Sequence, residues 1–308
     1  MKNINIVNGP QNVSAIVQGC MRMPDLDKEA AAKVIRTAYD CGINFFDHAT
    51  CYGNGVAEER FAEAFPLTGI KREDVYIQSK CGLCFDRNEF DWTKANILSS
   101  VDDSLRRLNV EYLDALLLHR PDVLFDPEEV AEAFDELEKA GKVRHFGVSN
   151  LVPMQIELLK KYVKQPLVFN QVQLSLEQSQ LIDQALYMNN KTTEFSINRD
   201  GNVLDYCRLK DITIQAWSPL QFGMFGGTFI ANPKFPELNA ALEKFAEREG
   251  VSRTAIAIAW ILRHPAKMQA IIGTMNPEHI KEICEASRVE LSHHDWYELY
   301  LAAGKYLP

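Results

Sequence analysis

One sequence pattern recurs along this chain: an amphipathic helical stretch, a glycine that ends it, and a short apolar run. In the first complete copy, one face of the helical stretch is formed by Ala31, Val34, Ile35 and Ala38. Gly42 ends that stretch, and residues 43–47 (INFFD) follow as a short buried strand. Because each such unit has an apolar helix face that must pack on another element, the pattern predicts helices packed against a sheet.

A later copy has clear helix-start signals. Asp126 can cap the helix, Pro127 takes the first position, where its missing N–H costs nothing, and Glu129 is spaced to complete a capping box. Gly141 stops the helix, and a strand at residues 143–148 follows. The sequence therefore predicts a helix from Pro127 to just before Gly141.

Eight apolar runs read as strands, and helix-patterned stretches separate most of them. They are residues 13–18, 43–47, 75–80, 112–118, 143–148, 167–172, 212–217 and 269–272. The runs show little strict alternation, as expected for parallel strands covered on both sides. Eight units with right-handed crossovers predict an α/β fold, a (β/α)8 TIM barrel, with residues 1–308 as a single domain.

A doubly wound sheet is the alternative architecture. No strand is followed by G-x-G-x-x-G or by a P-loop pattern, and the glycine cluster of residues 52–59 (YGNGVAEE) fits neither. Two stretches lie outside the repeat, residues 1–10 and residues 221–236. We expect the first of them to plug the bottom of the barrel.

Charge and composition exclude several partners. The formal net charge of -9 and the pI near 5.4 argue against a nucleic-acid surface, which needs clustered Lys and Arg. No apolar run approaches the roughly 20 residues that cross a bilayer, and the N-terminus lacks a secretory pattern. Seven scattered cysteines fit free thiols better than a disulfide framework. We expect a cytoplasmic enzyme.

Four chemically active side chains fall just after predicted strands. In a (β/α)8 barrel the active site forms at the carboxyl ends of the strands. Asp47, Lys80 and His119 end three of the apolar runs, and Tyr52 lies in the loop after the first of these. An acid, an amine, an imidazole and a phenol therefore converge on one rim.

Together these groups suit carbonyl reduction. A phenol with a pKa near ~10 is a poor acid at neutral pH, and the ammonium of Lys80 is expected to bring the pKa of Tyr52 down. Asp47 would hold Lys80 in place, and His119 would orient the substrate oxygen. Tyr52 is then the general acid toward a developing alkoxide, and the sequence calls for no metal.

At these residues the chain resembles the aldo/keto reductase family. The pattern G-x-N-x-x-D-x-A-x-x-Y-G matches residues 42–53, and similarity continues through residues 79–80, 116–122, 141–150, 169–173, 216–220 and 271–274. The resemblance covers essentially the whole chain and points to the bacterial branch of oxidoreductases without an assigned substrate. It implies an NAD(P)H-dependent reductase of small carbonyl compounds that is a monomer or a small homo-oligomer.

The resemblance also implies the nicotinamide contacts. Ser149, Asn150 and Gln171 would hydrogen-bond the carboxamide, and Trp217 would stack against the ring. Trp offers a larger π-face than the Tyr common at that position, and its indole N–H must find a partner. The remaining positions that the resemblance assigns near the cofactor are Met21, Arg22, Ser218, Pro219 and Leu220.

The adenosine end departs from the family pattern. Gly273, Thr274, Asn276 and Glu282 stand where the family binds the adenosine 2′-phosphate end, but His279 replaces the usual arginine. A guanidinium grips phosphate through two hydrogen bonds and is always charged, whereas an imidazole is not. NADP(H) is therefore the expected cofactor, and NAD(H) remains open.

Simpler structural interpretations compete with each assignment. Asp47 and Lys80 could be only a buried ion pair, and His119 alone could be a packed strand-end histidine. Cys81 and Cys84 have C-x-x-C spacing and could be a redox pair, although no second pair exists for a zinc site. The four rim residues in register favour catalysis.

Two other functions stay open. Some relatives of this fold bind the nucleotide mainly as regulatory subunits, and a lysine with a depressed pKa can form a Schiff base as in aldolases. Loop residues could also line an apolar substrate pocket, namely Met21, Phe85, Trp92, Phe222, Met224 and Phe225.

Overall fold

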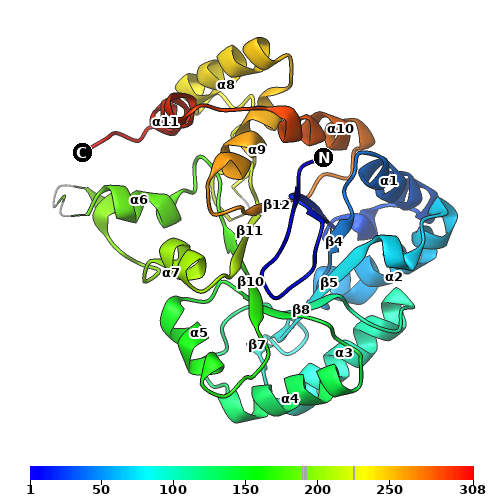
Figure 1. Ribbon diagram of the computed structural model, residues 1–308. Helices are drawn as coiled ribbons and strands as arrows, with labels where there is room; N and C mark the ends of the chain where they lie inside the picture. The colour runs from blue at the N-terminus through cyan, green and yellow to red at the C-terminus, as the bar shows by residue number, and fades with distance from the viewer. Residues whose placement is uncertain (189, 191–192, 225) are drawn as a thin grey trace.

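The structure is a computed structural model that describes residues 1–188, 190, 193–224 and 226–308. Eight parallel strands close into a barrel in the order β10-β11-β12-β3-β4-β5-β8-β9, and the helices surround it (Figure 1). The barrel strands are β3 (Ile16–Gly19), β4 (Phe45–Asp47), β5 (Tyr76–Cys81), β8 (Ala115–Leu118), β9 (Phe146–Ser149), β10 (Leu167–Gln173), β11 (Thr213–Trp217) and β12 (Gln269–Ile272). The predicted (β/α)8 barrel is confirmed.

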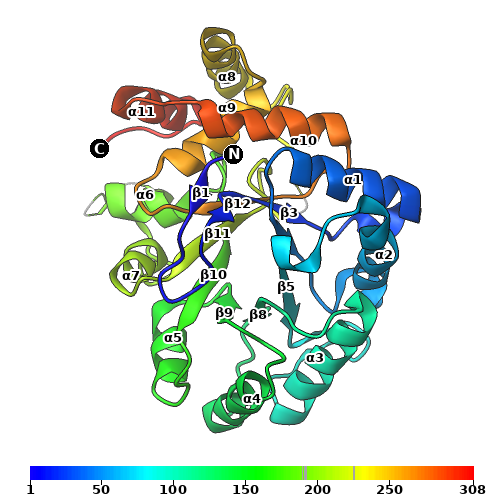
Figure 2. The ribbon, with the colours of Figure 1, turned by 45° about the vertical axis from the view of Figure 1, so that its right-hand side comes forward.

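Helices follow the barrel strands along the chain and cover them from outside (Figure 2). They are α1 (Lys28–Asp40), α2 (Val56–Ala64), α3 (Lys94–Leu108), α4 (Pro127–Lys139), α5 (Pro153–Lys160), α6 (Gln180–Leu186), α7 (Val203–Leu209), α8 (Pro236–Glu249), α9 (Arg253–Arg263), α10 (Pro277–Cys284) and α11 (His293–Ala302). The predicted stripe on α1 is buried against the sheet. The chain runs from the end of β11 through residues 221–235 into α8, and α9 follows before β12. Two helices, not one, therefore connect β11 to β12.

The start of α4 confirms one capping prediction and corrects another. Asp126 caps the helix by accepting a hydrogen bond from the Glu128 N–H, with Pro127 in the first turn. The predicted capping box is wrong, because the Glu129 carboxylate instead accepts a 3.0 Å hydrogen bond from the N–H of Lys94. Lys94 begins α3, so Glu129 fastens the start of a neighbouring helix.

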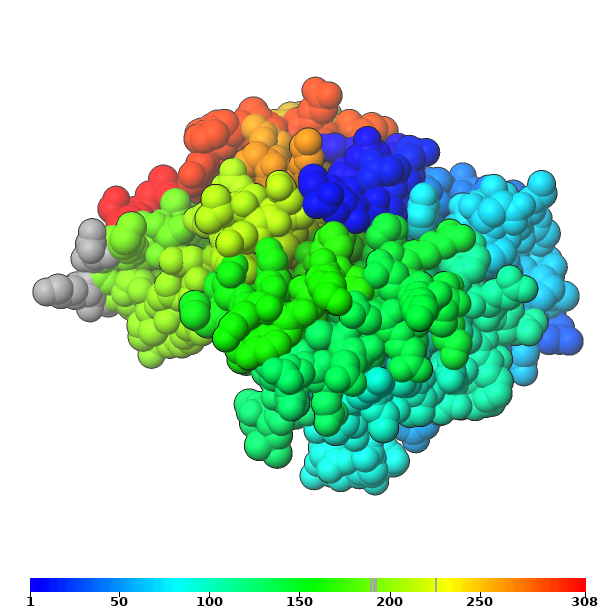
Figure 3. Space-filling model, turned by 60° about the horizontal axis from the view of Figure 1, so that its bottom comes forward, coloured from blue at the N-terminus to red at the C-terminus, as the bar shows by residue number. Residues whose placement is uncertain are grey.

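The N-terminal segment closes the bottom of the barrel. Strands β1 (Asn3–Ile4) and β2 (Val13–Ser14) form an antiparallel pair, which lies over the barrel opening in Figures 1 and 2. Asn44, directly before β4, hydrogen-bonds with Ser14 and Asn12, and the Tyr76 hydroxyl at the start of β5 donates to Gln11. These contacts are at strand starts. In Figure 3 the same blue residues lie at the surface between orange late segments and the green middle of the chain.

A second antiparallel pair, β6 (Leu83–Cys84) and β7 (Glu89–Phe90), stands in the loop after β5, at the opposite end of the barrel. No helix among the described residues is both long and apolar enough to span a bilayer.

Candidate active site

The four predicted catalytic residues meet at the carboxyl ends of β4, β5 and β8. Lys80, on β5, is fully buried, and its ammonium donates to Asp47 Oδ2 at 2.8 Å, to the His48 carbonyl at 2.7 Å and to Tyr52 Oη at 3.0 Å. The ammonium also lies 4.7 Å from the centre of the Tyr52 ring. All three donor positions of Lys80 are therefore used, and two of them join the predicted acid and phenol.

His119 completes the group from the end of β8. Its ring packs edge-on against Tyr52, with centroids 5.8 Å apart. Its Nδ1 lies 3.5 Å from the thiol sulfur of Cys51, which leaves Nε2 as the nitrogen free to reach a substrate. Burial, together with the charges of Lys80 and Arg120, holds the pKa of His119 well below its usual value. His119 is thus a neutral imidazole that can donate a hydrogen bond at pH 7.

The pKa of Tyr52 moves opposite to the direction expected from Lys80 alone. Burial of the phenol raises it, Lys80 lowers it, and Asp47 raises it again, to about 12 overall. For Lys80 itself, burial is the largest influence and acts to lower the pKa, but Asp47 and Tyr52 together outweigh it and hold the pKa above its usual value. Tyr52 therefore keeps its proton at neutral pH beside a permanently charged ammonium.

Asp47 is held by the amide of Gln78, which the sequence analysis did not single out, and by that of Gln171, which it placed at the nicotinamide carboxamide. Its Oδ1 accepts hydrogen bonds from Gln78 at 2.6 Å and from Gln171 at 3.1 Å. Both glutamines also bond Gln215, which in turn donates to Gln269 at 2.9 Å. With Oδ2 on Lys80, the carboxylate is fully occupied and its orientation is fixed.

A signal for these amides exists in the sequence. Gln78 and Gln215 each interrupt an apolar strand run with a polar side chain, and Gln269 begins another such run. A buried amide needs partners, so its presence in a barrel strand indicates an interior hydrogen-bond network.

The residues expected at the nicotinamide carboxamide lie side by side. Asn150 Nδ2 donates to Ser149 Oγ at 2.8 Å, and Ser149 Oγ donates to the Gln171 carbonyl at 2.8 Å. Trp217 Nε1 donates to Asn150 Oδ1 at 3.0 Å, so the indole N–H has its partner. Amide and hydroxyl groups beside a flat indole fit a ring that bears a carboxamide, although the Gln171 side-chain nitrogen is engaged with Asp47.

The loop after β11 continues from this group. Ser218 adopts a positive φ of 51°, Pro219 is buried, and the Leu220 carbonyl accepts a hydrogen bond from the Phe229 N–H. This chain path carries residues 218–220 along the rim between β11 and β12.

The loops after β3 and β12 are joined by Arg22. Its Nη1 donates to the Gly273 carbonyl at 3.0 Å, and a Cβ on Gly273 would lie only 2.7 Å from that nitrogen. Met21 beside it is exposed. The glycine therefore gives Arg22 room to lie across the rim, as a residue closing over an extended ligand would.

The residues expected near the adenosine end gather at the start of α10. Asn276 caps this helix by accepting from the Glu278 N–H, and Thr274 Oγ1 accepts from the Asn276 N–H. His279 and Glu282 lie on exposed turns of the same helix. A capped helix start with nearby hydroxyl and imidazole groups fits a phosphate-bearing ligand.

The residues predicted to line an apolar substrate pocket differ in exposure. Trp92 is buried and packs against Phe125. Phe85 and Met224 are exposed at the mouth, Phe222 packs on Phe235, and Phe225 lies outside the described residues.

The two cysteines with C-x-x-C spacing, Cys81 and Cys84, are both free thiols in the structure. Burial raises the pKa of Cys81 to about 12, while Cys84 lies near Arg87 and Asn96. Among the described residues no cluster of three or more His, Cys, Asp or Glu side chains could hold a metal ion.

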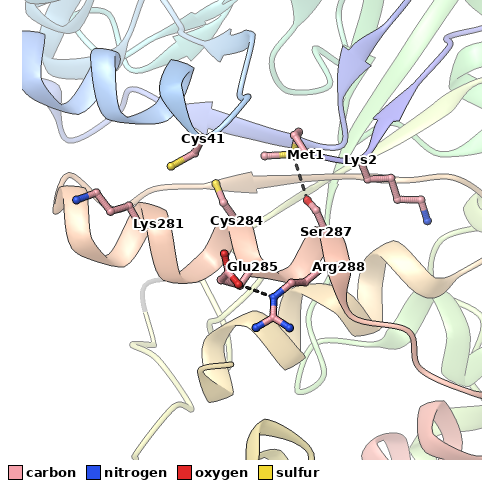
Figure 4. Close-up of a pocket in the computed structure, with 8 residues that line it drawn as sticks. All are labelled: Met1, Lys2, Cys41, Lys281, Cys284, Glu285, Ser287 and Arg288. Atoms are coloured by element: carbon pink, nitrogen blue, oxygen red, sulfur yellow. Dashed lines mark hydrogen bonds and ion pairs between the residues drawn. The ribbon is translucent and has the colours of Figure 1, made fainter. Parts of the chain in front are cut away.

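A pocket of about 590 Å³ lies away from the tetrad, at the strand-start end (Figure 4). It is lined by Met1 and Lys2, by Cys41 directly after α1, and by residues of α10 and the turn that follows it, including Cys284.

Comparison with known proteins agrees with this geometry. The sequence model of the Aldo/keto reductase family matches residues 15–300. A 6-dehydroglucose reductase of Agrobacterium fabrum is 35% identical over 305 residues, which are 95% of each chain. The uncharacterized oxidoreductase YcsN of Bacillus subtilis is 34% identical over 305 residues, which are also 95% of each chain. The solved thermostable aldo-keto reductase Tm1743 aligns with a TM-score of 0.79 over 98% of this chain and 100% of its own, at 24% identity.

Proposed function

Because the chain belongs to the aldo/keto reductase family and is an NAD(P)-dependent oxidoreductase, we propose that it reduces aldehydes or ketones to alcohols with Tyr52 as the proton donor. One observation carries the proposal: a single buried ammonium, that of Lys80, donates to both Asp47 and Tyr52 Oη. A structural ion pair would not need the phenol, and a neutral imidazole at 5.8 Å ring separation would then have no role.

NADP(H), or NAD(H), would supply the hydride when bound. Ser149, Asn150 and Gln171 would hold its carboxamide, and Trp217 would form the wall against its ring. Met21, Arg22 and residues 218–220 would line its middle. Gly273, Thr274, Asn276, His279 and Glu282 would line its adenosine end. We favour NADP(H), with Lys281 one turn from the helix start as a second cation near His279.

The chain's own residues handle the oxygen and the proton. His119 donates from Nε2 to the substrate carbonyl oxygen and so fixes the carbonyl against Tyr52. As negative charge grows on that oxygen, the Tyr52 proton moves to it, and the adjacent Lys80 ammonium stabilises the phenolate left behind. Asp47 keeps Lys80 charged and aimed. The carbon gains a hydride, the oxygen gains a proton, and an alcohol leaves.

Tyr52→Phe tests the proton donor. Turnover of NADPH, and separately of NADH, would be measured with a panel of aldehydes, α-dicarbonyls and quinones. We expect the rate to fall by about 10²- to 10⁴-fold, the range for removal of a general acid. Nucleotide affinity, measured from cofactor fluorescence, is expected to stay the same because the carboxamide contacts remain.

Tyr162→Phe is the matched control, since it removes a phenol hydroxyl from the helical layer. Comparable turnover in Tyr52→Phe and Tyr162→Phe would remove Tyr52 from the mechanism. Tight nucleotide binding by the unmodified protein, with no turnover of any carbonyl, would favour a regulatory nucleotide-binding subunit instead. Trapping of a carbonyl substrate on Lys80 by borohydride would indicate Schiff-base chemistry.

A further inference from the structure

Arg120 stands at the mouth of the candidate site. It follows His119 directly, at the end of β8, so its Cα is within one residue step of a tetrad member. Its guanidinium lies 5.5 Å from the centre of the Trp217 ring and 4.0 Å from the sulfur of Met224. The side chain is half-buried. A cation is thus held among the phenol, the imidazole and apolar groups.

This cation has no carboxylate partner in the described part of the chain. The ion pairs there join many other arginines to Asp or Glu, and none of them includes Arg120. Burial lowers the pKa of Arg120, and the only titrating groups that act against this are Tyr52 and Cys51, which are neutral at pH 7. The contact with Trp217 is a cation–π contact, and the hydrogen-bond acceptor that the described residues offer the guanidinium is the weak thioether sulfur of Met224.

A half-buried guanidinium that has no counter-ion gains a strong partner when a ligand supplies an anion. The guanidinium offers a planar fork of N–H donors that matches a carboxylate with two parallel hydrogen bonds. Trp217 and Met224 reduce the water around it, which strengthens such a pair.

We propose that Arg120 binds a carboxylate of the substrate, so that the preferred substrates are oxo acids whose carbonyl lies between Tyr52 and His119. This inference rests on the proposed reductase function. Arg120 and His119 are consecutive residues, whose Cα atoms are about 3.8 Å apart. Because the guanidinium of Arg120 also lies at the Trp217 ring, we expect the preferred oxo acids to carry the carboxylate and the carbonyl a few bonds apart.

The test uses two substrates that differ in one charge. 4-Oxobutanoate and its methyl ester carry the same aldehyde, and the saturated chain insulates the aldehyde from the electronic effect of the acid. The values of kcat and KM are measured with NADPH for the unmodified protein, Arg120→Gln and Arg120→Lys. Arg106→Gln, on the exposed face of α3, removes the same charge away from the mouth and is the matched control.

We expect the unmodified protein to prefer the acid over the ester by about tenfold or more in kcat/KM. Arg120→Gln should lower this preference by about tenfold to a hundredfold, mainly through the KM of the acid, as loss of a charged hydrogen bond predicts. Arg120→Lys should keep part of the preference, because it retains the charge and loses the fork. Arg106→Gln should leave the preference unchanged.

Three results would overturn the inference. Equal kcat/KM for acid and ester in the unmodified protein would do so, as would equal losses for both substrates in Arg120→Gln. Weaker NADPH binding in Arg120→Gln with an unchanged preference would assign the guanidinium to a cofactor phosphate. Failure of the unmodified protein to reduce any carbonyl compound would instead overturn the proposed function, so the two failures are distinguishable.

Discussion

The side chain of His48 is buried beside the tetrad but takes no part in its hydrogen bonds. Its ring packs edge-on against Phe61 of α2, with centroids 4.7 Å apart. Neither ring nitrogen has a hydrogen-bond partner among the described residues. Burial, and secondly the charge of Lys80, lowers the pKa of His48 to about 3. The folded protein thus holds a neutral imidazole where a charged one would be strongly disfavoured.

This burial predicts a loss of stability in acid. Between pH 6.5 and about 3 the unfolded chain binds a proton at His48 and the folded chain does not, so stability falls as the pH is lowered. The slope from one such group is at most about 1.4 kcal/mol per pH unit. His48→Phe should remove this share, which urea unfolding at pH 7 and pH 4.5 would measure.

His294→Asn, at an exposed position, is the control and should leave the pH dependence unchanged. If the larger Phe ring prevents folding, His48→Leu makes the same test. An identical loss of stability between the two pH values in the His48 variants and the unmodified protein would contradict the prediction.

At the scale of residues, the sequence predicted the positions of catalytic side chains that directly follow a strand. Asp47, Lys80 and His119 were predicted to meet because the carboxyl ends of barrel strands share one rim. The partners of Gln78 and the missing partner of Arg120 could not be predicted in this way. Both depend on which side chains other strands and loops bring within about 3 Å, which a local pattern does not encode.

Two helices meet through a pair of thiols. Cys41 follows the last turn of α1, and Cys284 ends α10. Their side chains point toward one another at the pocket of Figure 4, and burial raises the pKa of Cys41, an effect that Cys284 partly offsets. Burial, with Cys41, raises the pKa of Cys284 to about 12. The pair is well placed for a bond but holds little thiolate at neutral pH.

We expect oxidised glutathione to join Cys41 and Cys284 slowly at pH 7 and faster at higher pH, by up to about tenfold per unit. Two thiol hydrogens are lost, and two molecules of reduced glutathione are formed. Peptide mapping would identify the bridge, and the Tm should rise because the bridge constrains the unfolded chain.

Cys41→Ser should abolish the bridge, while Cys207→Ser, which lies elsewhere and is buried, should not. Recovery of only glutathione adducts, with no linked peptide, would count against this juxtaposition of the two helices.

At the scale of elements, helix starts were predictable when the cap is local. Asp126 needs only its own helix to act as a cap, and it does so. Glu129 is close to the start of α3 in space and accepts a hydrogen bond from the Lys94 N–H there. This contact between two helices forms in place of the local capping box. The short strands β6 and β7, two residues each, carry too little pattern to be recognised.

Across the whole molecule, the N-terminal segment shares the core of the barrel. Ile6 is 1% exposed, and its side chain lies beside Gly9, close to Val168 of β10. We expect Ile6→Ala to lower the free energy of unfolding by about 2–4 kcal/mol, as for a buried aliphatic residue. Urea unfolding followed by tryptophan fluorescence and by nucleotide binding would measure it.

Val7→Ala, at a neighbouring exposed position, should change stability by less than about 0.5 kcal/mol. Coincident transitions by both probes are expected if residues 1–308 unfold as one domain. An early transition seen by one probe alone would show that the segment opens independently of the barrel.

The alternation of strand and helix made the barrel predictable as a whole. Each of the eight predicted runs overlaps an observed barrel strand, because period and length are read within single segments. The pairing of the last barrel strand, β12, with the first, β3, forms the seam of the barrel. It could be predicted only from the number of strand–helix units, since nothing local in either strand specifies the other.

That seam also bears on how the protein is made. The first and last barrel strands pair with each other, and Gln269 bonds the Ser14 carbonyl across 255 residues of chain. Ribosomes deliver the chain from its N-terminus, so β3 must wait unpaired on one side until nearly the whole polypeptide has emerged. During that interval the growing sheet has two open edges, at which strands of other chains can add. The sheet is therefore open to pairing with other chains until β12 has emerged and closed the barrel.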